Sequence, residues 1–352
     1  MGDTMKAVDI KNGKGPATAL FINDATPKPA PKAGEALVRI KAFGLNRMDL
    51  IQREGHYPLP PQAPATLGVE FSGTIESLGT DGDEKEQEGF KLGDAVFGLA
   101  YGGAYVEYIA VSTAMLLHKP ATLSWEQAAA IPETWMTATQ ALHIVGEFGS
   151  NNGNNNAKSV EKKAVLWHAG ASGVSIAGIQ LSRDAGAGAV YATCGSDEKC
   201  AFVEKELGAT RAFNYRTDPG WDKAVLEATG GGGVDLIVDF VGADYFERNL
   251  AAAGRDARWV MLGLLGGAQL PAGVNIAPLL YKRVRVEGST LRSRDLAYQR
   301  MLRDRLAAYV PHFENGRLKV FVDAVLPMGE IVKAHQLMEE NKTKGKIVCT
   351  VP

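Results

Sequence analysis

The sequence predicts an α/β protein: a doubly wound parallel sheet, with helices on both faces, joined to a second domain of antiparallel strands. The first observation is a run at 164–181 with the pattern of a strand, a tight turn and a helix. The second is the alternation of strand-like and helix-like segments from 164 to 263, which is typical of parallel sheets. The third is a series of short strands and turns over 6–108. A chain of 352 residues is long enough for two such domains.

The N-terminal part of the chain is predicted to be the antiparallel β domain. Polar and apolar residues alternate over 35–43, which is typical of a half-buried strand. Several prolines between 58 and 64 predict a stiff extended loop, because each one fixes its own φ and restricts the residue before it. The charged segment 80–89 is predicted to be a solvated loop. The final strand-like segment, 346–351, is expected to return to this domain.

The second domain is predicted from helix signals followed by alternating elements. Ser124, with Gln127 three residues later, predicts the start of a helix over 125–130. The Asn-rich tract 149–156 is predicted to be a disordered loop insertion, because it cannot bury apolar surface. The remaining helices are expected at 136–145, from the glycine turn to 185, at 198–207 and at 295–313, and the remaining strands at 164–168, 189–193, 235–240, 258–263 and, at a sheet edge, 284–289.

Composition narrows the classes of partner and compartment. A formal net charge of −2 with scattered basic residues gives no reason to expect a nucleic acid or an anionic membrane as partner. Three dispersed cysteines are too few for a disulfide framework and favour a reducing compartment. No apolar run reaches membrane-spanning length and the first residues lack the apolar core of a secretory signal, so a cytoplasmic location is expected.

The run from Ala164 to Leu181 places a turn of small residues between a strand and a helix. Unpaired N–H groups and the helix dipole suit such a turn to an anionic pyrophosphate. The dinucleotide-binding fingerprint has glycines at the positions of Gly170, Ser172 and Ser175, and only the first is kept here. Gly173 adds another small residue. Taken alone, the run is also compatible with an ordinary strand-to-helix turn.

The end of the second strand distinguishes between two cofactors. NAD-binding proteins place an acidic residue there, which accepts hydrogen bonds from the ribose hydroxyls. This chain instead has Ser196, which can donate to a phosphate, Lys199, whose charge can offset it, and Tyr215 at the next strand end. This pattern favours NADPH. Asp197 and Glu198 argue the other way, although acidic residues are common in first helical turns, and Lys199 is alternatively a solvated helix charge.

Six stretches along the chain carry a family resemblance. They are 45–57 (LNRMDLIQREGHY), 128–138 (AAAIPETWMTA), 168–174 (HAGASGV), 213–215 (FNY), 291–295 (LRSRD) and 341–348 (NKTKGKIV). The chain resembles the medium-chain dehydrogenase/reductase superfamily and, within it, the zinc-free quinone oxidoreductase branch, with the tumour-suppressor-inducible members as the most similar group. The resemblance implies a GroES-like β domain, formed by 1–133 and 293–352, and a Rossmann domain, 134–292. NADPH would lie in the cleft between them.

The resemblance also implies roles for individual residues. Asn46 and Tyr57 would line the nicotinamide and quinone pocket and Thr137 would lie near the nicotinamide, so these three are the expected catalytic residues. The 2′-phosphate would be held by Ser196, Lys199 and Tyr215. The other residues expected to contact the cofactor are Gly170, Ser172, Gly173 and Val174 at the pyrophosphate, and Asn46, Thr137, Gly242, Gly263, Leu264, Leu291 and Lys346 elsewhere. Ser175 departs from the family glycine that packs helix against strand, and the Asn-rich tract is a second departure.

The positions that hold zinc in related alcohol dehydrogenases have other residues here. The resemblance places the first ligand position in Leu45–Arg47 and the second in Leu67–Glu70, and neither stretch contains Cys or His. The loop after Gly79 lacks the four closely spaced cysteines of a structural zinc site. We therefore expect no metal, which removes the Lewis acid that alcohol oxidation uses.

The expected activity is NADPH-dependent reduction of quinones, with ortho-quinones as the expected class, by a homodimer. A quinone accepts reducing equivalents without a metal because its product recovers aromaticity, so the protein has to position the reactants and exclude water. Tyr57 is a candidate hydrogen-bond or proton donor to the quinone oxygen, or alternatively a packing wall. The edge strand 284–289 is expected to pair across a twofold axis.

Two other functions are compatible with the same sequence. The fold and cofactor also serve reductases of activated carbon–carbon double bonds, such as enones or enoyl thioesters. A crystallin-like or RNA-associated protein would keep the fold and the cofactor without turnover. The presence of Asn46, Tyr57, Thr137 and Lys199 argues against this last reading, because a scaffold would not need them.

Overall fold

The computed structural model describes residues 3–79, 89–149, 159 and 162–352. The chain divides into two compact units, one formed by 1–136 together with 292–352 and the other by 137–291. Apart from Gly89 and Gly149, the predicted charged loop 80–89 and the predicted disordered tract 149–156 lie outside the described residues.

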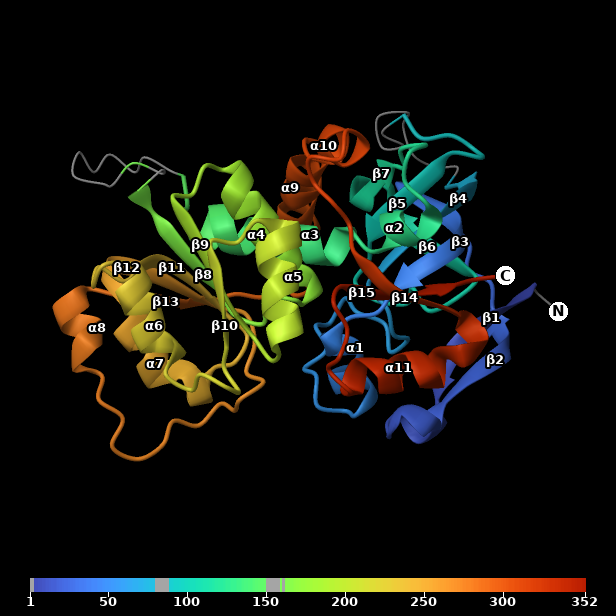
Figure 1. The fold of residues 1–352 in the computed structure, drawn as a ribbon. Coiled ribbons are helices and arrows are strands. Elements are labelled where there is room, and N and C mark those ends of the chain that lie inside the picture. The colour runs from blue at the N-terminus through green and yellow to red at the C-terminus, as the bar shows by residue number, and fades with distance from the viewer. Residues whose placement is uncertain (1–2, 80–88, 150–158, 160–161) are drawn as a thin grey trace. The chain divides into compact units, whose positions relative to one another are not determined.

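The first unit contains both ends of the chain and is built on a mostly antiparallel sheet (Figure 1). Its strands are β1 (Thr4–Ile10), β2 (Leu20–Pro27), β3 (Glu35–Gly44), β4 (Glu70–Leu78), β5 (Ala95–Leu99), β6 (Tyr108–Ser112), β7 (Leu116–His118), β14 (Val322–Pro327) and β15 (Lys346–Thr350). The main sheet has the order β14-β15-β3-β4-β5-β7, β6 also pairs with β3, and β1 and β2 form a separate pair. The strand predicted at 35–43 is confirmed, and so is the return of the C-terminal strand, because β15 pairs with β3.

Short helices complete the first unit, and one spans its boundary. They are α1 (Arg47–Arg53), α2 (Trp125–Ala129), α3 (Pro132–Thr139), α9 (Leu296–Ala307), α10 (Val310–Glu314) and α11 (Ile331–Glu339). The predicted start of α2 is confirmed by a capping box. The Ser124 hydroxyl accepts from the N–H of Gln127, and the Gln127 side chain accepts from the N–H of Ser124.

The second unit is a six-stranded parallel sheet covered by helices, which confirms the predicted doubly wound α/β fold (Figure 1). Its strands are β8 (Ala164–Trp167), β9 (Ala189–Cys194), β10 (Arg211–Asn214), β11 (Val234–Asp239), β12 (Ala253–Met261) and β13 (Arg285–Gly288), and its helices are α4 (Gly173–Asp184), α5 (Asp197–Leu207), α6 (Trp221–Ala228), α7 (Phe246–Ala252) and α8 (Ala277–Lys282). The order β10-β9-β8-β11-β12-β13 reverses direction between β8 and β11. Ligands of such sheets bind beyond the carboxyl ends of the strands near this reversal.

Two helix predictions are wrong at their boundaries because of proline. The helix predicted at 136–145 begins at Pro132, which is tolerated in a first turn where no N–H partner is needed, and it continues as a π-helical segment, Gln140–Val145. The helix predicted at 295–313 is two helices. Pro311 cannot donate to a preceding carbonyl, and α9 ends before it at Ala307.

The strand prediction at 258–263 is also wrong at its start. Strand β12 begins at Ala253, and its pairing with β11 shifts register before Arg258. Asp256, which lies within the shifted segment, has a positive φ of 64° and therefore a left-handed backbone conformation. Helices α6, α7 and α8 were not predicted.

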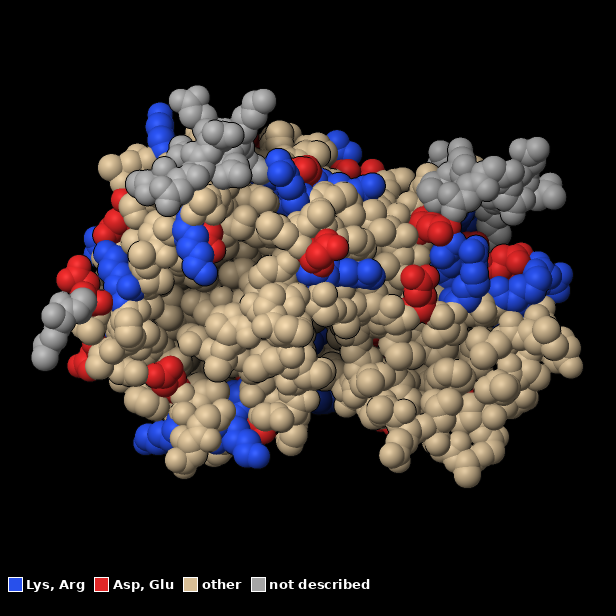
Figure 2. Space-filling model, turned by 180° about the vertical axis from the view of Figure 1, so that it is seen from behind, with Lys and Arg blue, Asp and Glu red and all other residues tan. Residues whose placement is uncertain are grey.

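No helix of the described residues is both long and apolar enough to cross a bilayer. On the face shown in Figure 2, basic and acidic side chains are interspersed rather than gathered by sign. This distribution agrees with the formal net charge of −2.

One histidine of the first unit is fully buried on α11. Nη1 of Arg53 lies 3.2 Å from Nδ1 of His335, and the Nε2 atom of His335 has no hydrogen-bond partner. The ring also makes an edge contact with Tyr105. Burial and the neighbouring Arg53 charge lower the pKa of His335 from 6.5 to about 3, so the folded protein holds this imidazole neutral.

We expect acid to destabilise the first unit through His335. Because its pKa is about 3 in the folded protein and near 6.5 in the unfolded chain, the unfolded chain binds one more proton between these values. The free energy of unfolding therefore falls as the pH drops below 6.5, by about 2 kcal/mol between pH 6 and pH 4.5. Urea unfolding at these two pH values should show that His335→Gln loses about 2 kcal/mol less than the wild type. Equal losses would contradict the buried neutral state.

Candidate functional site

The turn after β8 approaches the neighbouring strand so closely that only glycine fits. A Cβ atom at Gly170 would lie 2.8 Å from Cβ of Ala192 and 3.1 Å from Sγ of Cys194. The backbone N–H of Gly170 donates to the carbonyl of Thr193 at 2.8 Å. The one fingerprint glycine that this chain keeps is therefore the one that packs the turn against β9.

Two serines stand where the fingerprint has its other glycines, and both have partners. Ser172 is the N-cap of α4, and its Oγ lies 3.5 Å from the backbone N of Ser175. The buried Ser175 hydroxyl donates to the carbonyl of His168 at 2.7 Å. A hydroxyl that is satisfied in this way costs little in a packed interior, which explains how the helix accepts Ser175. Gly173 and Val174 form the first turn of α4, where helical N–H groups have no intrahelical acceptor.

A buried polar network joins the carboxyl ends of β8, β9 and β11. His168 follows β8, and its Nδ1 and Nε2 atoms lie 2.9 Å from Thr193 Oγ1 and 2.7 Å from Asn249 Oδ1. Asn249 in turn donates to Asp239, whose carboxylate also accepts from the backbone N–H of Gly242. Burial lowers the pKa of His168, so its ring is neutral: Nε2–H donates to Asn249 and Nδ1 accepts from Thr193. The network fixes the loops that a dinucleotide would contact.

The end of β9 brings together the residues predicted to hold a 2′-phosphate. Ser196 is the N-cap of α5 and accepts from the backbone N–H of Lys199 at 3.2 Å. A Cβ atom at Gly195 would lie 2.6 Å from the hydroxyl oxygen of Tyr215, so the tyrosine side chain covers that glycine. The carboxylate of Asp197 accepts from Asn214 at 2.7 Å and has a local partner. Tyr215 thus covers Gly195, the residue before Ser196, and the backbone of Lys199 lies beside the Ser196 hydroxyl.

The remaining residues predicted to contact a cofactor in the second unit lie near the ends of β11 and β12, with two exceptions. Gly242 has φ +81°, and a Cβ atom there would lie 2.8 Å from Leu264 Cδ2. A Cβ at Gly263 would lie 3.1 Å from the carbonyl oxygen of Phe240. Leu264 is half exposed. The exceptions are Thr137, buried on α3, and Leu291, buried at the last position of the unit.

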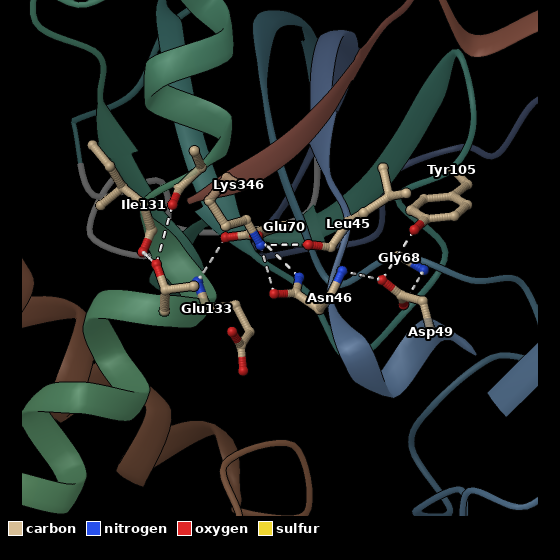
Figure 3. Close-up of polar contacts among 11 residues, drawn as sticks. Leu45, Asn46, Asp49, Gly68, Glu70, Tyr105, Ile131, Glu133 and Lys346 are labelled. Carbon is tan, nitrogen blue, oxygen red and sulfur yellow. Dashed lines mark hydrogen bonds and ion pairs between the residues drawn. The ribbon is translucent and has the colours of Figure 1, made fainter. Parts of the chain in front are cut away.

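A buried cluster around Lys346 connects distant segments of the first unit (Figure 3). Lys346 begins β15 and is 5% exposed. Its ammonium donates to the carbonyl oxygen of Leu45 and to Oδ1 of Asn46, both at 2.6 Å. It also forms an ion pair with Oε1 of Glu70 at 2.6 Å. Three acceptors match the three N–H bonds of an ammonium, so Lys346, predicted as a cofactor contact, is fully engaged within this unit.

Besides Lys346, the Glu70 carboxylate also accepts hydrogen bonds from the segments that begin α1 and α3. Its Oε1 accepts from Nδ2 of Asn46 at 2.9 Å, and its Oε2 accepts from the backbone N–H of Glu133 at 2.9 Å, at the start of α3. A Cβ atom at Gly44 would overlap the Glu70 carboxylate, so the end of β3 has to be glycine. The amide of Asn46 is therefore held on both sides, with its oxygen towards Lys346 and its nitrogen towards Glu70 (Figure 3).

Asp49 fixes the backbone of the same turn, and sequence reasoning missed it. Its Oδ2 accepts from the backbone N–H of Asn46 at 2.8 Å and from the Tyr105 hydroxyl at 3.0 Å, while Oδ1 accepts from Gly68 at 3.2 Å. Burial raises the pKa of Asp49. The spacing of Asn46 and Asp49 is that of a helix N-cap and its third residue, and this signal could have found Asp49.

Tyr57 lies in the loop after α1, where it is half-buried. The centre of the Arg292 guanidinium lies 5.4 Å from the centroid of the Tyr57 ring. The sequence singled out Tyr57 but assigned no role to Arg292.

The stretches that would supply zinc ligands instead surround a lysine. Among the residues that the structure describes, no group of three or more His, Cys, Asp or Glu side chains is arranged to hold a metal ion. Asn46 and Glu70, which lie in those stretches, hold the ammonium of Lys346. A divalent cation placed among the same oxygens would be repelled by that charge. That the protein takes up no zinc stays a prediction.

Comparison with known proteins adds two family models and several full-length relatives. The model described as an alcohol dehydrogenase GroES-like domain matches 32–121, and the one described as a zinc-binding dehydrogenase matches 173–307. A zinc-type alcohol dehydrogenase-like protein of Schizosaccharomyces pombe is 29% identical over 341 residues, 90% of this chain and 91% of the relative. A quinone oxidoreductase of Lama guanicoe is 27% identical over 346 residues, 98% and 97% of the two chains. Prostaglandin reductase-3 of Mus musculus is 29% identical over 349 residues, 95% and 86% of the two.

Solved structures of other proteins are also similar to this chain over nearly its whole length. An NAD-dependent alcohol dehydrogenase has a TM-score of 0.81 and 31% identity, covering 99% of this chain and 100% of that one. A mycobacterial protein complexed with NADPH has a TM-score of 0.80 and 27% identity, covering 98% and 99%. The CurK enoyl reductase has a TM-score of 0.81 and 25% identity, covering 99% and 100%.

The chain belongs to the medium-chain dehydrogenase/reductase superfamily. The expected combination of a GroES-like domain with a Rossmann-like parallel sheet is confirmed. The protein is therefore an oxidoreductase of this superfamily, with quinone oxidoreductase-like relatives.

Proposed function

We propose that the protein is an NADPH-dependent reductase of quinones, with ortho-quinones as the preferred class, that works without a metal ion. The observation that carries the choice of cofactor is the end of β9, where Ser196 caps α5 beside the backbone of Lys199, Tyr215 covers the preceding Gly195, and Asp197, the first of two acids in that turn, is engaged by Asn214. A neighbouring structure complexed with NADPH supports this choice. Assignment to the tumour-suppressor-inducible group is part of the proposal and rests on the motif resemblance.

In this proposal one group of residues binds the cofactor and another contacts the acceptor. Lys199, Ser196 and Tyr215 hold the 2′-phosphate by charge and hydrogen bonds. The first turn of α4 holds the pyrophosphate with its backbone N–H groups. The bound cofactor supplies the reducing equivalents. Asn46, fixed by Lys346 and Glu70, presents a rigid amide to the reactants, and Tyr57 donates a hydrogen bond or proton to the acceptor oxygen.

A specific finding favours a second candidate function, reduction of activated carbon–carbon double bonds. Relatives of similar identity include a prostaglandin reductase and an enoyl reductase. The same residues would serve that reaction, because an enone also presents a carbonyl oxygen to Tyr57. The two functions differ only in the acceptor.

The acceptor is determined by following NADPH absorbance with an ortho-quinone, an enone, an enoyl thioester and no acceptor. We expect consumption with the ortho-quinone that exceeds the rate with the other acceptors. Consumption only with the enone or thioester would replace the quinone assignment with the second function. NADPH binding without turnover on any acceptor would refute both and support a non-catalytic protein.

The cofactor assignment predicts a selective effect of Lys199→Ala. Loss of a charge-assisted contact with the 2′-phosphate should raise the KM for NADPH about 10-fold to 100-fold and leave the KM for NADH nearly unchanged. The matched control is Lys205→Ala, which removes a lysine from the last turn of the same helix and should alter neither constant. Equal effects of Lys199→Ala on the two cofactors would contradict the phosphate role.

We also propose that the protein is a homodimer through the edge of its parallel sheet. Strand β13 pairs with β12 on one side only, and its four residues are exposed. Apolar side chains on and beside it, Val286, Leu280 and Tyr281, are exposed by 40%, 73% and 72%. A second copy related by a twofold axis would extend the sheet and cover both features.

Light scattering after size exclusion tests the dimer. The wild type should have twice the mass of one chain, and Val286→Pro, which removes a backbone donor from the edge strand, should shift it towards the monomer. Val325→Pro in β14, the edge strand of the other sheet, is the control and should leave the mass unchanged. A monomeric wild type, or a dimer insensitive to Val286→Pro, would refute the interface.

A further inference from the structure

A buried arginine lies beside Tyr57 and has no role so far. Arg292 is 5% exposed, and two contacts fix its guanidinium. Nη1 donates to Oε1 of Gln52 at 2.7 Å, and Nε donates to the carbonyl oxygen of Tyr101. Gly102 leaves room for the third nitrogen, because a Cβ atom there would lie 2.6 Å from Nη2. The surrounding chain is therefore shaped to hold this guanidinium in one place.

No carboxylate forms an ion pair with Arg292 in the described part of the chain, although the charge of Asp49 raises its pKa from further away. Its hydrogen bonds go to an amide and a carbonyl, and Nη2 has no hydrogen-bond partner. Burying an ion without a counter-charge is costly, and burial accordingly lowers the pKa of Arg292. By contrast, the buried Arg53 has ion pairs with two glutamates. Burial of an unpaired guanidinium is expected at a position where a neighbouring group becomes negatively charged during the reaction.

The nearest group that can supply this negative charge is the phenol of Tyr57. The guanidinium lies against the Tyr57 ring, 5.4 Å from centre to centroid. Burial raises the pKa of Tyr57, and Asp49 and Glu133 raise it too, whereas Arg292 opposes them. Arg292 is thus the one charged neighbour that favours the phenolate over the phenol.

We propose that Arg292 is a positioning residue for Tyr57: it holds the phenol ring and stabilises the phenolate left when Tyr57 donates its proton to the acceptor oxygen. This inference rests on the proposed function. A bound NADPH would supply the hydride that the acceptor takes up and would leave as NADP⁺. The O–H bond of Tyr57 breaks as an O–H bond forms on the acceptor, and the phenolate regains its proton from water. In the phenolate state, the buried guanidinium has a counter-charge directly beside it.

The test is a double-mutant cycle with Arg292→Met and Tyr57→Phe, measured as kcat with an ortho-quinone at saturating NADPH. Each single variant should lower kcat about 10-fold to 100-fold, and the double variant should be no slower than Tyr57→Phe, because Arg292 acts through the hydroxyl. The KM for NADPH should stay unchanged. In D2O, the slowing of kcat should be larger for Arg292→Met than for the wild type and should disappear in Tyr57→Phe.

Two controls separate this role from simple packing. Arg294→Met removes an arginine whose guanidinium centre lies 4.5 Å from the ring of Tyr298, so it deletes a similar contact without touching Tyr57 and should leave kcat unchanged. Arg292→Lys keeps the charge, and it should restore part of the kcat that Arg292→Met loses. It also replaces Arg292→Met in the cycle if that variant fails to fold.

The possible outcomes separate a failure of the Arg292 role from a failure of the proposed function. A wild type that reduces no acceptor would refute the proposed function and this role with it. An active wild type with equal kcat for Tyr57→Phe, or with additive losses in the double variant, would overturn the role of Arg292 alone. Tyr57→Phe makes this decisive, because it keeps the ring of a half-buried side chain and removes only the hydroxyl, so it should not prevent folding.

Discussion

The ion pair between Lys346 and Glu70 is the interaction on which the first unit depends. It joins the last strand of the chain to β4, and through Asn46 and the backbone of Glu133 it also reaches the starts of α1 and α3. Both side chains are buried, so removing either one would leave an uncompensated charge in the interior, at a cost of about 3–5 kcal/mol. The pair has a second consequence: it holds the Asn46 amide with its oxygen towards Lys346 and its nitrogen towards Glu70.

The second unit uses a neutral network for the same purpose. His168, Asn249 and Asp239 connect the loops after β8, β9 and β11, and each hydrogen bond has a defined donor and acceptor. A fully satisfied buried network gives a single arrangement of its members. In both units, then, the loops expected to meet the cofactor and acceptor are held by polar groups from distant segments. This rigidity suits a reaction in which the protein mainly positions its reactants.

The sequence predicted the features whose signals come from residues close together in the chain, and it missed contacts between residues far apart. The parallel sheet, the Ser124 capping box and the glycine turn at Gly170 rest on residues within one strand, turn or helix, and all were predicted. The partners of Lys346 and Arg292 lie hundreds of residues away, and no pattern in a single sequence links them. The partners of His168 are likewise distant in the sequence: Thr193 and Asn249 lie 25 and 81 residues away. The helix boundaries near two prolines were predicted wrongly. Pro132 begins a helix, and a helix predicted to run through Pro311 is divided into two.

The central claim is that an ammonium, rather than a metal ion, holds Asn46 and Glu70 at the site. The most direct measurement is the zinc content of the protein purified from zinc-supplemented cells without chelator, together with the proposed quinone reductase activity before and after dialysis against a chelator. We expect far less than one zinc per chain and an activity that dialysis leaves unchanged. One zinc per chain, lost together with activity on dialysis and restored with it by added zinc, would show that a metal ion takes the place assigned here to the ammonium of Lys346.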